Sequence, residues 1–162
     1  MTFLLWIERS WLGQFIASDT YAAPALLCFH AVGMGIVVGA IWMYNFRILG
    51  FSRRMSFTAF TNLKRVAWIG FFLNLASGVL LFTASASRLI VNLNFQLKML
   101  FMVLGGLTVW WLARVVAQGS EREEPASFPM GVKAIAVVSA LFWCAVIFTG
   151  RYIAYTLGPP NF

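Results

Sequence analysis

Residues Ala22 to Tyr44 read AAPALLCFHAVGMGIVVGAIWMY, and this stretch decides the fold. It contains no charged side chain and is long enough to cross the hydrocarbon layer of a bilayer, which takes about 20 mostly apolar residues. It also carries His30, the only histidine of the chain. An imidazole at membrane depth is costly to bury and is by default a candidate for function. The stretch therefore predicts a membrane helix that holds a functional group.

The composition of the 162-residue chain is that of an integral membrane protein, with 61% hydrophobic and 10% charged residues. The net charge of +7 is compatible with nucleic-acid binding, but the cations fall at the ends of the apolar stretches and form no stripe on a soluble face. Four spans use nearly the whole chain and leave no room for a separate catalytic domain. We therefore expect a single membrane domain over residues 1–162, without stand-alone catalytic activity and without a nucleic-acid partner.

The apolar pattern predicts an all-α integral membrane fold. We expect a four-transmembrane-helix bundle that follows an N-terminal periplasmic interfacial amphipathic helix. The interfacial helix is expected at residues 2–18, where Glu8 and Arg9 interrupt an aromatic-rich segment that is too short to span. Ser18, Asp19 and Thr20 offer a cap for the first span. The four spans are expected at residues 22–44, 66–84, 97–117 and 134–155.

The basic residues predict the orientation of the chain. They concentrate in the connections that follow the first and the third span, whereas few lie between the second and the third. By the positive-inside rule, the basic connections are cytoplasmic. We therefore expect a multi-pass protein of the bacterial inner (cytoplasmic) membrane with both termini in the periplasm.

Two stripes of small residues with a spacing of four predict which helix faces pack. In the first span the stripe consists of Ala31, Gly35 and Gly39. In the second span it consists of Gly70, Asn74 and Gly78. We expect another helix to pack on each stripe, with His30 on a neighbouring face that also points inward, and we expect Asn74 to bond across helices.

His30 is compatible with several kinds of site. Neutral imidazole is a common axial ligand of haem b, and the second ligand would then be a methionine, a symmetry-related His30 or a residue of a partner. The candidate methionines are Met34, Met99 and Met102. A quinone contact or a proton relay is another interpretation, and Cu(I) is a minor one. Alternatively, the ring binds no cofactor and only hydrogen-bonds a neighbouring helix through Asn74, Ser77 or Thr108.

Lys98 and Arg151 form a second candidate group, at the outer boundary of the membrane. Cations at that depth are suited to hold haem propionates or an anionic headgroup. The simpler interpretation is that both side chains snorkel and that Asp19 forms an ion pair with one of them. At the other end of the first span, we expect Asn45 to cap the helix and Arg47 to contact lipid phosphate.

Four short motifs are spread along the chain: HAVG at 30–33, NFRILG at 45–50, FQLK at 95–98 and GRYIAY at 150–155. Together they resemble the signature of an uncharacterised family of small four-span bacterial inner-membrane proteins, a domain of unknown function. That family's pattern has an aspartate where this chain has Asn45. The resemblance covers most of the chain, implies no activity, and supports His30, Lys98 and Arg151 as candidate site residues. The architecture is also loosely similar to that of four-helix cytochrome b and copper-resistance membrane proteins.

The hypothesis from the sequence is a membrane-embedded redox or cofactor-binding subunit that passes electrons within a larger inner-membrane assembly. Its ligand would be haem b, a metal held by His30, or a quinone, and its candidate binding residues are His30, Met34, Met99, Met102, Asn74, Lys98 and Arg151. The alternative is a non-catalytic structural or assembly subunit in which His30 only packs or hydrogen-bonds between helices. A small-molecule transporter ranks third. The expected partners are the lipid bilayer and other membrane or periplasmic subunits, or a second copy of this chain.

Overall fold

Long apolar helices form the body of the molecule in the computed structural model, which describes residues 2–51, 57–119 and 128–157. The described helices are α1 Thr2–Glu8, α2 Trp11–Ser18, α3 Ala22–Leu49, α4 Phe57–Ala84, α5 Ala86–Ile90, α6 Leu93–Gly119 and α7 Met130–Thr156. Four of these helices, α3, α4, α6 and α7, are long and apolar enough to cross a membrane. The prediction of an all-α bundle with four membrane-spanning helices is confirmed.

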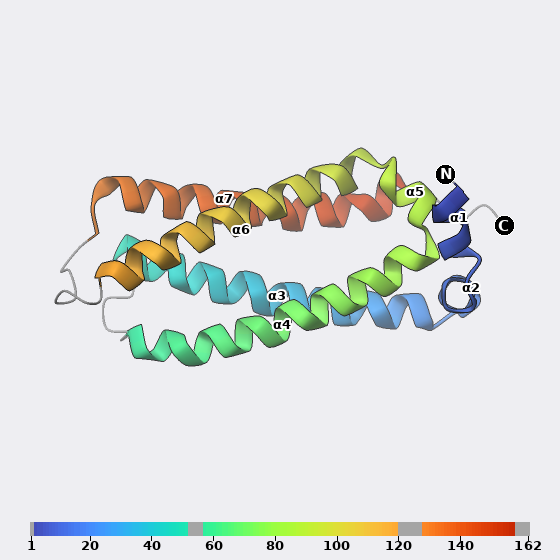
Figure 1. Cartoon of the computed structure of the whole chain (residues 1–162), viewed down its shortest axis with the longest axis horizontal. Helices are drawn as coiled ribbons and strands as arrows, with labels where there is room; N and C mark the ends of the chain where they lie inside the picture. Colours follow the sequence, from blue (N-terminus) through green and yellow to red (C-terminus); the bar gives the residue numbers. More distant parts are fainter. Residues whose placement is uncertain (1, 52–56, 120–127, 158–162) are drawn as a thin grey trace.

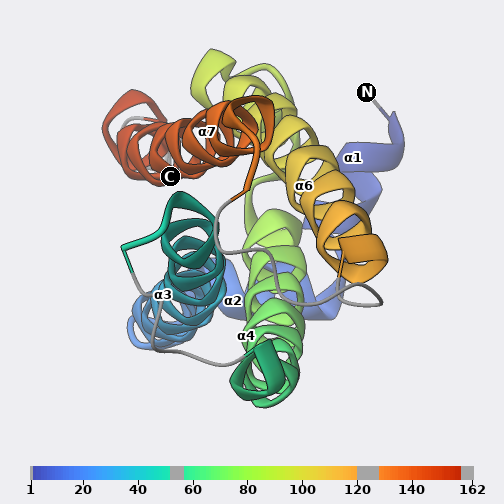
Figure 2. The same cartoon turned by 90° about the vertical axis from the view of Figure 1, so that its left-hand side faces the viewer.

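The four long helices form two hairpins, α3 with α4 and α6 with α7, and the hairpins meet mainly where α3 packs on α7. Figure 2 shows this arrangement end-on. In Figure 1 the long helices run along the long axis of the molecule, and α1, α2 and α5 lie together at one end. We call this end the cap end, and we call the opposite end, where α3 ends and α7 begins, the distal end.

Glycine allows α3 and α4 to approach each other closely. A Cβ atom on Gly33 would lie 2.7 Å from the backbone nitrogen of Asn74 and 2.9 Å from the carbonyl oxygen of Gly70. A Cβ atom on Gly70 would lie 2.6 Å from the side chain of Ile36. Lipid tails are as apolar as the helices, so close backbone contact of this kind is a main source of helix association in a membrane.

The predicted stripe on the first span does not pack on another described helix. Ala31, Gly35 and Gly39 are exposed, and a Cβ atom added to either glycine would have no described atom within 4 Å. The packed face of α3 is the neighbouring one, which carries His30 and Gly33. The prediction is therefore wrong for the helices of this chain. A spacing of four identifies a face of a helix but does not say which of two adjacent faces meets a neighbour.

The segment 2–18 folds as two short helices and not as the single helix that we predicted. Ser10 separates them, because its extended backbone ends α1 while its Oγ accepts a hydrogen bond from the backbone nitrogen of Gly13 at 3.2 Å and caps α2. Glu8 Oε1 fixes the pair to α5, since it accepts from the backbone nitrogen and from Oγ of Ser87, both at 2.8 Å. Several aromatic side chains stay exposed on the two helices: Phe3, Trp6, Trp11 and Phe15.

The spanning helices extend beyond their predicted bounds. Of the three residues predicted to cap α3, Asp19 does so, because its Oδ1 accepts from the backbone nitrogens of Tyr21 at 2.9 Å and Ala22 at 2.7 Å. The helix ends at Gly50, whose φ of 95° is left-handed and suits glycine. Asn45 does not cap this end as we expected. It lies a full turn before the end, and its side chain is completely buried.

We predict that Gly33→Ala destabilises the protein and that Gly35→Ala does not. The added methyl group on Gly33 meets backbone atoms of α4, and overpacking of this kind costs about 1–3 kcal/mol. In thermal unfolding in detergent, the Gly33 variant should unfold about 2–10 °C below the wild type. The Gly35 variant is the matched control, since its methyl group enters open space. Equal unfolding temperatures for the two variants would contradict the packing described here.

Candidate functional site

His30 lies half-buried on the packed face of α3, and α4 holds its ring. The Nδ1 atom of His30 is 3.0 Å from the backbone oxygen of Asn74 and 3.2 Å from Oγ of Ser77. In return, Nδ2 of Asn74 donates to the backbone oxygen of His30 at 2.8 Å. Each residue therefore bonds the other's carbonyl group, which ties the two helices together at this level.

The hydrogen bonds of the ring assign its tautomer. A backbone carbonyl oxygen only accepts, so Nδ1 of His30 must carry the proton that it donates to Asn74. Ser77 is compatible with this assignment, because its hydroxyl donates to the carbonyl oxygen of Leu73 at 2.7 Å and leaves its own lone pairs free to accept. In a neutral imidazole with a proton on Nδ1, the other ring nitrogen, Nε2, carries a lone pair.

Lys98 of α6 approaches that lone pair. Its Nζ atom lies 3.2 Å from Nε2 of His30. The aliphatic part of the lysine passes along α7, where a Cβ atom on Gly150 would lie 3.5 Å from the lysine Cε. Lysine has donors and no acceptor, so Nζ donates to Nε2. The site therefore brings all four long helices to one place, and the Lys98 to His30 hydrogen bond joins one hairpin to the other.

Glycine also makes room for the ring. A Cβ atom on Gly78 would lie 3.0 Å from Cε1 of His30 and 3.3 Å from Nδ1. Gly70, Asn74 and Gly78 all face α3, as the second stripe predicted, and Asn74 bonds across helices as expected. The prediction for the second span is confirmed.

Within the described ranges, no carboxylate lies within salt-bridge distance of Lys98. The two acidic residues of this part of the chain lie at the cap end, where Glu8 accepts hydrogen bonds from Ser87 and Asp19 accepts from the first backbone nitrogen of α3. An ammonium group has three donor hydrogens, and His30 uses one of them. The site is thus a hydrogen-bond donor with cationic character between apolar helices, which suits a ligand whose oxygen accepts hydrogen bonds.

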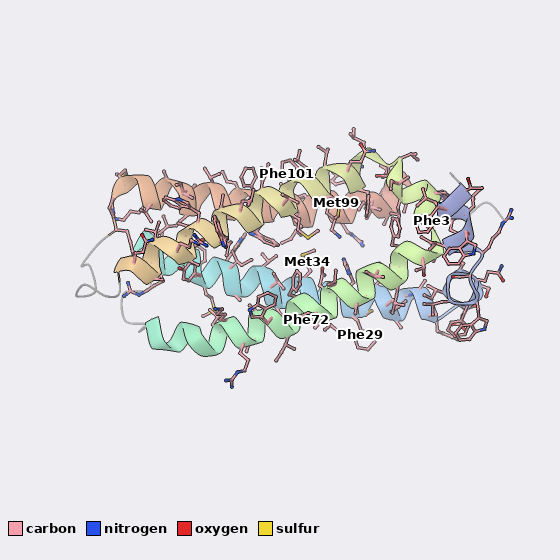
Figure 3. The ribbon with its side chains drawn as sticks, viewed as in Figure 1. Phe3, Phe29, Met34, Phe72, Met99 and Phe101 are labelled. Carbon is pink, nitrogen blue, oxygen red and sulfur yellow. The ribbon has the colours of Figure 1, made fainter. Side chains whose placement is uncertain are left out.

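The predicted methionines divide into two groups. Met34 of α3 and Met102 of α6 pack on one apolar cluster next to the site, formed by Val37, Val38, Trp143 and Val146. Met99 is 43% exposed and does not belong to that cluster. In Figure 3, Met34 and Met99 both lie near the middle of the length of the bundle, far from Phe3 at the cap end. The thioethers of Met34 and Met102 are therefore placed inside the bundle, but no hydrogen bond joins them to the site.

Arg151 does not join the site. Its side chain is exposed and its guanidinium lies over the ring of Tyr155, 5.5 Å from the ring centre.

The expected ion pair of Asp19 with Lys98 or Arg151 does not form among the described residues. Asp19 caps α3 instead, and Lys98 turns inward to His30. The sequence placed both cations at the membrane boundary, because it does not reveal that Gly150 of α7 leaves space for the Lys98 side chain to reach His30.

Thr108, the third partner that we considered for His30, bonds within its own helix. Its Oγ1 donates to the carbonyl oxygen of Gly105 at 2.6 Å. In the part of the chain that the structure describes, no group of three or more His, Cys, Asp or Glu side chains could hold a metal ion.

These observations define the protein as a multi-pass helical membrane bundle with a histidine and lysine pair in its interior. The chain belongs to a family of unknown function, DUF6644, whose model matches residues 3–156. The resemblance to an uncharacterised membrane family that the sequence motifs indicated is therefore confirmed. Searches of curated proteins and of solved structures found no match.

The tautomer of His30 is directly testable, because the chain contains a single histidine. We predict that protein labelled with ¹⁵N-histidine and reconstituted in lipid shows one protonated Nδ1 and one unprotonated Nε2 near neutral pH. Solid-state ¹⁵N NMR measures both. The variant Asn74→Leu removes the side-chain hydrogen bond but keeps the carbonyl group that accepts from Nδ1, so the tautomer should persist in it. A proton on Nε2 in the wild type would contradict the arrangement.

Proposed function

We propose that this protein is a quinone-binding subunit of a redox assembly in the bacterial inner membrane, with Lys98 and His30 at the quinone headgroup. The distance of 3.2 Å between Lys98 Nζ and His30 Nε2 carries this proposal, because it puts a proton donor and a proton acceptor side by side among apolar helices. Ionisable residues at this depth are rare unless they serve a ligand or a proton. A lipid-soluble ligand with polar oxygens suits both the site and its surroundings.

The chemistry of a quinone uses both groups. Its carbonyl oxygens accept hydrogen bonds, and the remaining donors of Lys98 are suited to them. Reduction of a quinone to a quinol takes up two electrons and two protons, and we assign the electrons to a partner subunit. Lys98 would supply a proton to the reduced oxygen and would be reprotonated from the solvent, so that both protons pass through it in turn. Nε2 of His30, which carries a lone pair, would accept the hydrogen bond of the ammonium group and hold it at the headgroup. The roles of His30 and Lys98 are thus to bind the headgroup and to move protons, in keeping with a subunit that has no stand-alone activity.

Haem b fits the residues less well. Axial ligation uses the lone pair of a ring nitrogen, and the lone pair on Nε2 of His30 faces Lys98. The bond from Nδ1 to the Asn74 carbonyl is, in contrast, what a metal-ligating histidine commonly makes. Haem ligation would therefore require Lys98 to turn away, with Met34 or Met102 as candidates for the second axial position. A quinone requires no such movement, and for this reason we propose it first.

A structural or assembly role is the second candidate. The observation that favours it is the reciprocal bonding of His30 and Asn74, which by itself satisfies the ring nitrogen Nδ1 and ties α3 to α4. Polar side chains often join membrane helices in this way without binding a ligand. In both proposals the cap end faces the periplasm, following the positive-inside rule.

A quinone assay of the purified protein tests the proposal. We expect quinone to co-purify with the wild type in mild detergent, and a short-chain quinone to bind again after its removal. Lys98→Met should weaken that binding about tenfold or more, since a hydrogen bond from a charged donor contributes about 1.5–3 kcal/mol. Arg151→Gln is the matched control, because it removes an exposed cation that lies over Tyr155 and does not join the site, and it should leave binding unchanged.

Other outcomes separate the alternatives. A Soret absorption band that disappears in His30→Ala would identify the ligand as haem and would contradict the quinone proposal. A wild-type protein that is colourless and binds no quinone would contradict both cofactor proposals. If His30→Ala then also lowers the stability of the protein, the structural role is supported.

A further inference from the structure

A second polar region lies in the distal half of the bundle. Within the described part of the chain, five buried side-chain atoms have no hydrogen-bond partner: Trp42 Nε1, Asn45 Oδ1, Asn45 Nδ2, Ser139 Oγ and Trp143 Nε1. Asn45 and Ser139 are both completely buried. Most buried polar atoms in proteins bond another protein atom or an ordered water molecule, so a group of five such atoms requires an explanation.

Asn45 and Ser139 lie at the contact between α3 and α7. Near the distal end, Ile48 of α3 clusters with Ala136 of α7. Further toward the cap end, Val38 clusters with Trp143 and Val146. The two helices therefore run antiparallel in register along this contact. Asn45 precedes Ile48 by about one turn and Ser139 follows Ala136 by about one turn, so both lie between the two clusters. We call this level of the contact the polar seam.

Trp42 and Trp143 lie on the same two helices, each about one helical turn from the seam. Trp143 reaches across to α6, where a Cβ atom on Gly105 would lie 3.0 Å from its Nε1. Trp42 packs against the cluster to which Trp143 belongs. Trp42 precedes Asn45 by three residues and Trp143 follows Ser139 by four, so this part of the bundle holds two further N–H donors that have no described partner.

Ser139 differs from the other serine and threonine side chains that the structure describes in the four long helices. Ser77, Thr83, Thr108, Thr149 and Thr156 each donate to a carbonyl oxygen three or four residues earlier in their own helix. Such bonds are the usual way in which a serine or threonine is satisfied inside a membrane helix. Ser139 makes no bond of this kind to any described residue. Its hydroxyl is therefore available to a ligand in the seam.

We propose that the polar seam binds ordered water. The unpartnered atoms include donors on Trp42, Trp143 and Asn45 and acceptors on Asn45 and Ser139, so their ligand must both donate and accept. The five atoms belong to uncharged side chains, which favours a neutral ligand. Water has these properties, and a buried water typically makes about three hydrogen bonds to atoms that would otherwise lack a partner.

The seam is separate from the histidine and lysine pair. Asn45 and His30 are on the same helix, about 22 Å apart along its axis. Between them, Met34, Val37 and Val38 belong to or pack on an apolar cluster. Water in the seam is therefore independent of whether His30 and Lys98 bind a quinone, and it goes beyond the function proposed above.

Solid-state NMR of protein in lipid, with ¹⁵N-labelled tryptophan, detects such water. We expect transfer of magnetisation from water to the indole N–H groups of Trp42 and Trp143, which are assigned by replacing each tryptophan with phenylalanine. Ser139→Ala should reduce the transfer and Asn45→Leu should abolish it. Thr149→Val is the matched control, because it deletes a hydroxyl of α7 that bonds its own helix. Absence of transfer to both indoles in the wild type would overturn the proposal.

Thermal unfolding of Ser139→Ala gives an independent result that differs between a seam that holds water and one that does not. If water bridges these groups, Ser139→Ala removes one of its partners and lowers the unfolding temperature by about 2–4 °C, the shift expected for the loss of one hydrogen bond in a chain of this size. If the seam is dry, removal of an unpartnered hydroxyl leaves the unfolding temperature unchanged or raises it. The second result would also overturn the proposal. Ser139→Ala is a small change, so the test does not depend on Asn45→Leu being able to fold.

Discussion

The hydrogen bond between Lys98 and His30 is the interaction on which the centre of this structure depends. Each hairpin of the bundle has its own close packing, but the two hairpins meet mainly along α3 and α7. Lys98 extends from α6 to the ring on α3 and adds a polar contact between them. Because lipid provides no hydrophobic force between helices, contacts of this kind contribute to specific association. They also bring two ionisable side chains together inside the bundle.

The pair depends on residues that have little or no side chain. Gly78 leaves space for the imidazole, and Gly150 lets the lysine pass α7. Gly33 allows the backbone of α3 to approach Asn74, whose carbonyl oxygen accepts from Nδ1 and so fixes which ring nitrogen is left for Lys98. The chemistry of the site therefore depends on helix packing. Ser77 and Asn74 orient the ring, and the lysine completes the site from the opposite hairpin.

Much of the fold could be predicted from the sequence. Long apolar stretches determine the spans, and Asp19 marks the start of α3 because an unpaired backbone N–H group needs an acceptor. The role of Asn74 was also predictable, since an amide at membrane depth must bond across helices. The break at Ser10 was missed, although serine is a common helix cap, because aromatic residues on both sides suggested one continuous amphipathic helix.

The candidate site was predicted only in part. His30 was identified because it is a single ionisable residue at membrane depth, but its partner Lys98 was assigned to the boundary. A lysine can extend toward either the interface or the interior, and the choice depends on Gly150 in a helix that is distant in sequence. The packed face of α3 was predicted wrongly for a similar reason, since the periodicity of one helix does not specify which of its faces meets a neighbour. Asn45 was expected to cap a helix that in fact continues past it.

A double-mutant cycle on His30 and Lys98 is the most direct test that these two side chains interact inside the bundle. The free energy of unfolding would be measured in detergent for the wild type, His30→Phe, Lys98→Met and the double variant. The structure predicts a coupling energy of about 1–3 kcal/mol, as for a hydrogen bond with a charged donor. Strictly additive effects of the two substitutions would show that Lys98 does not contact His30, and would contradict the account.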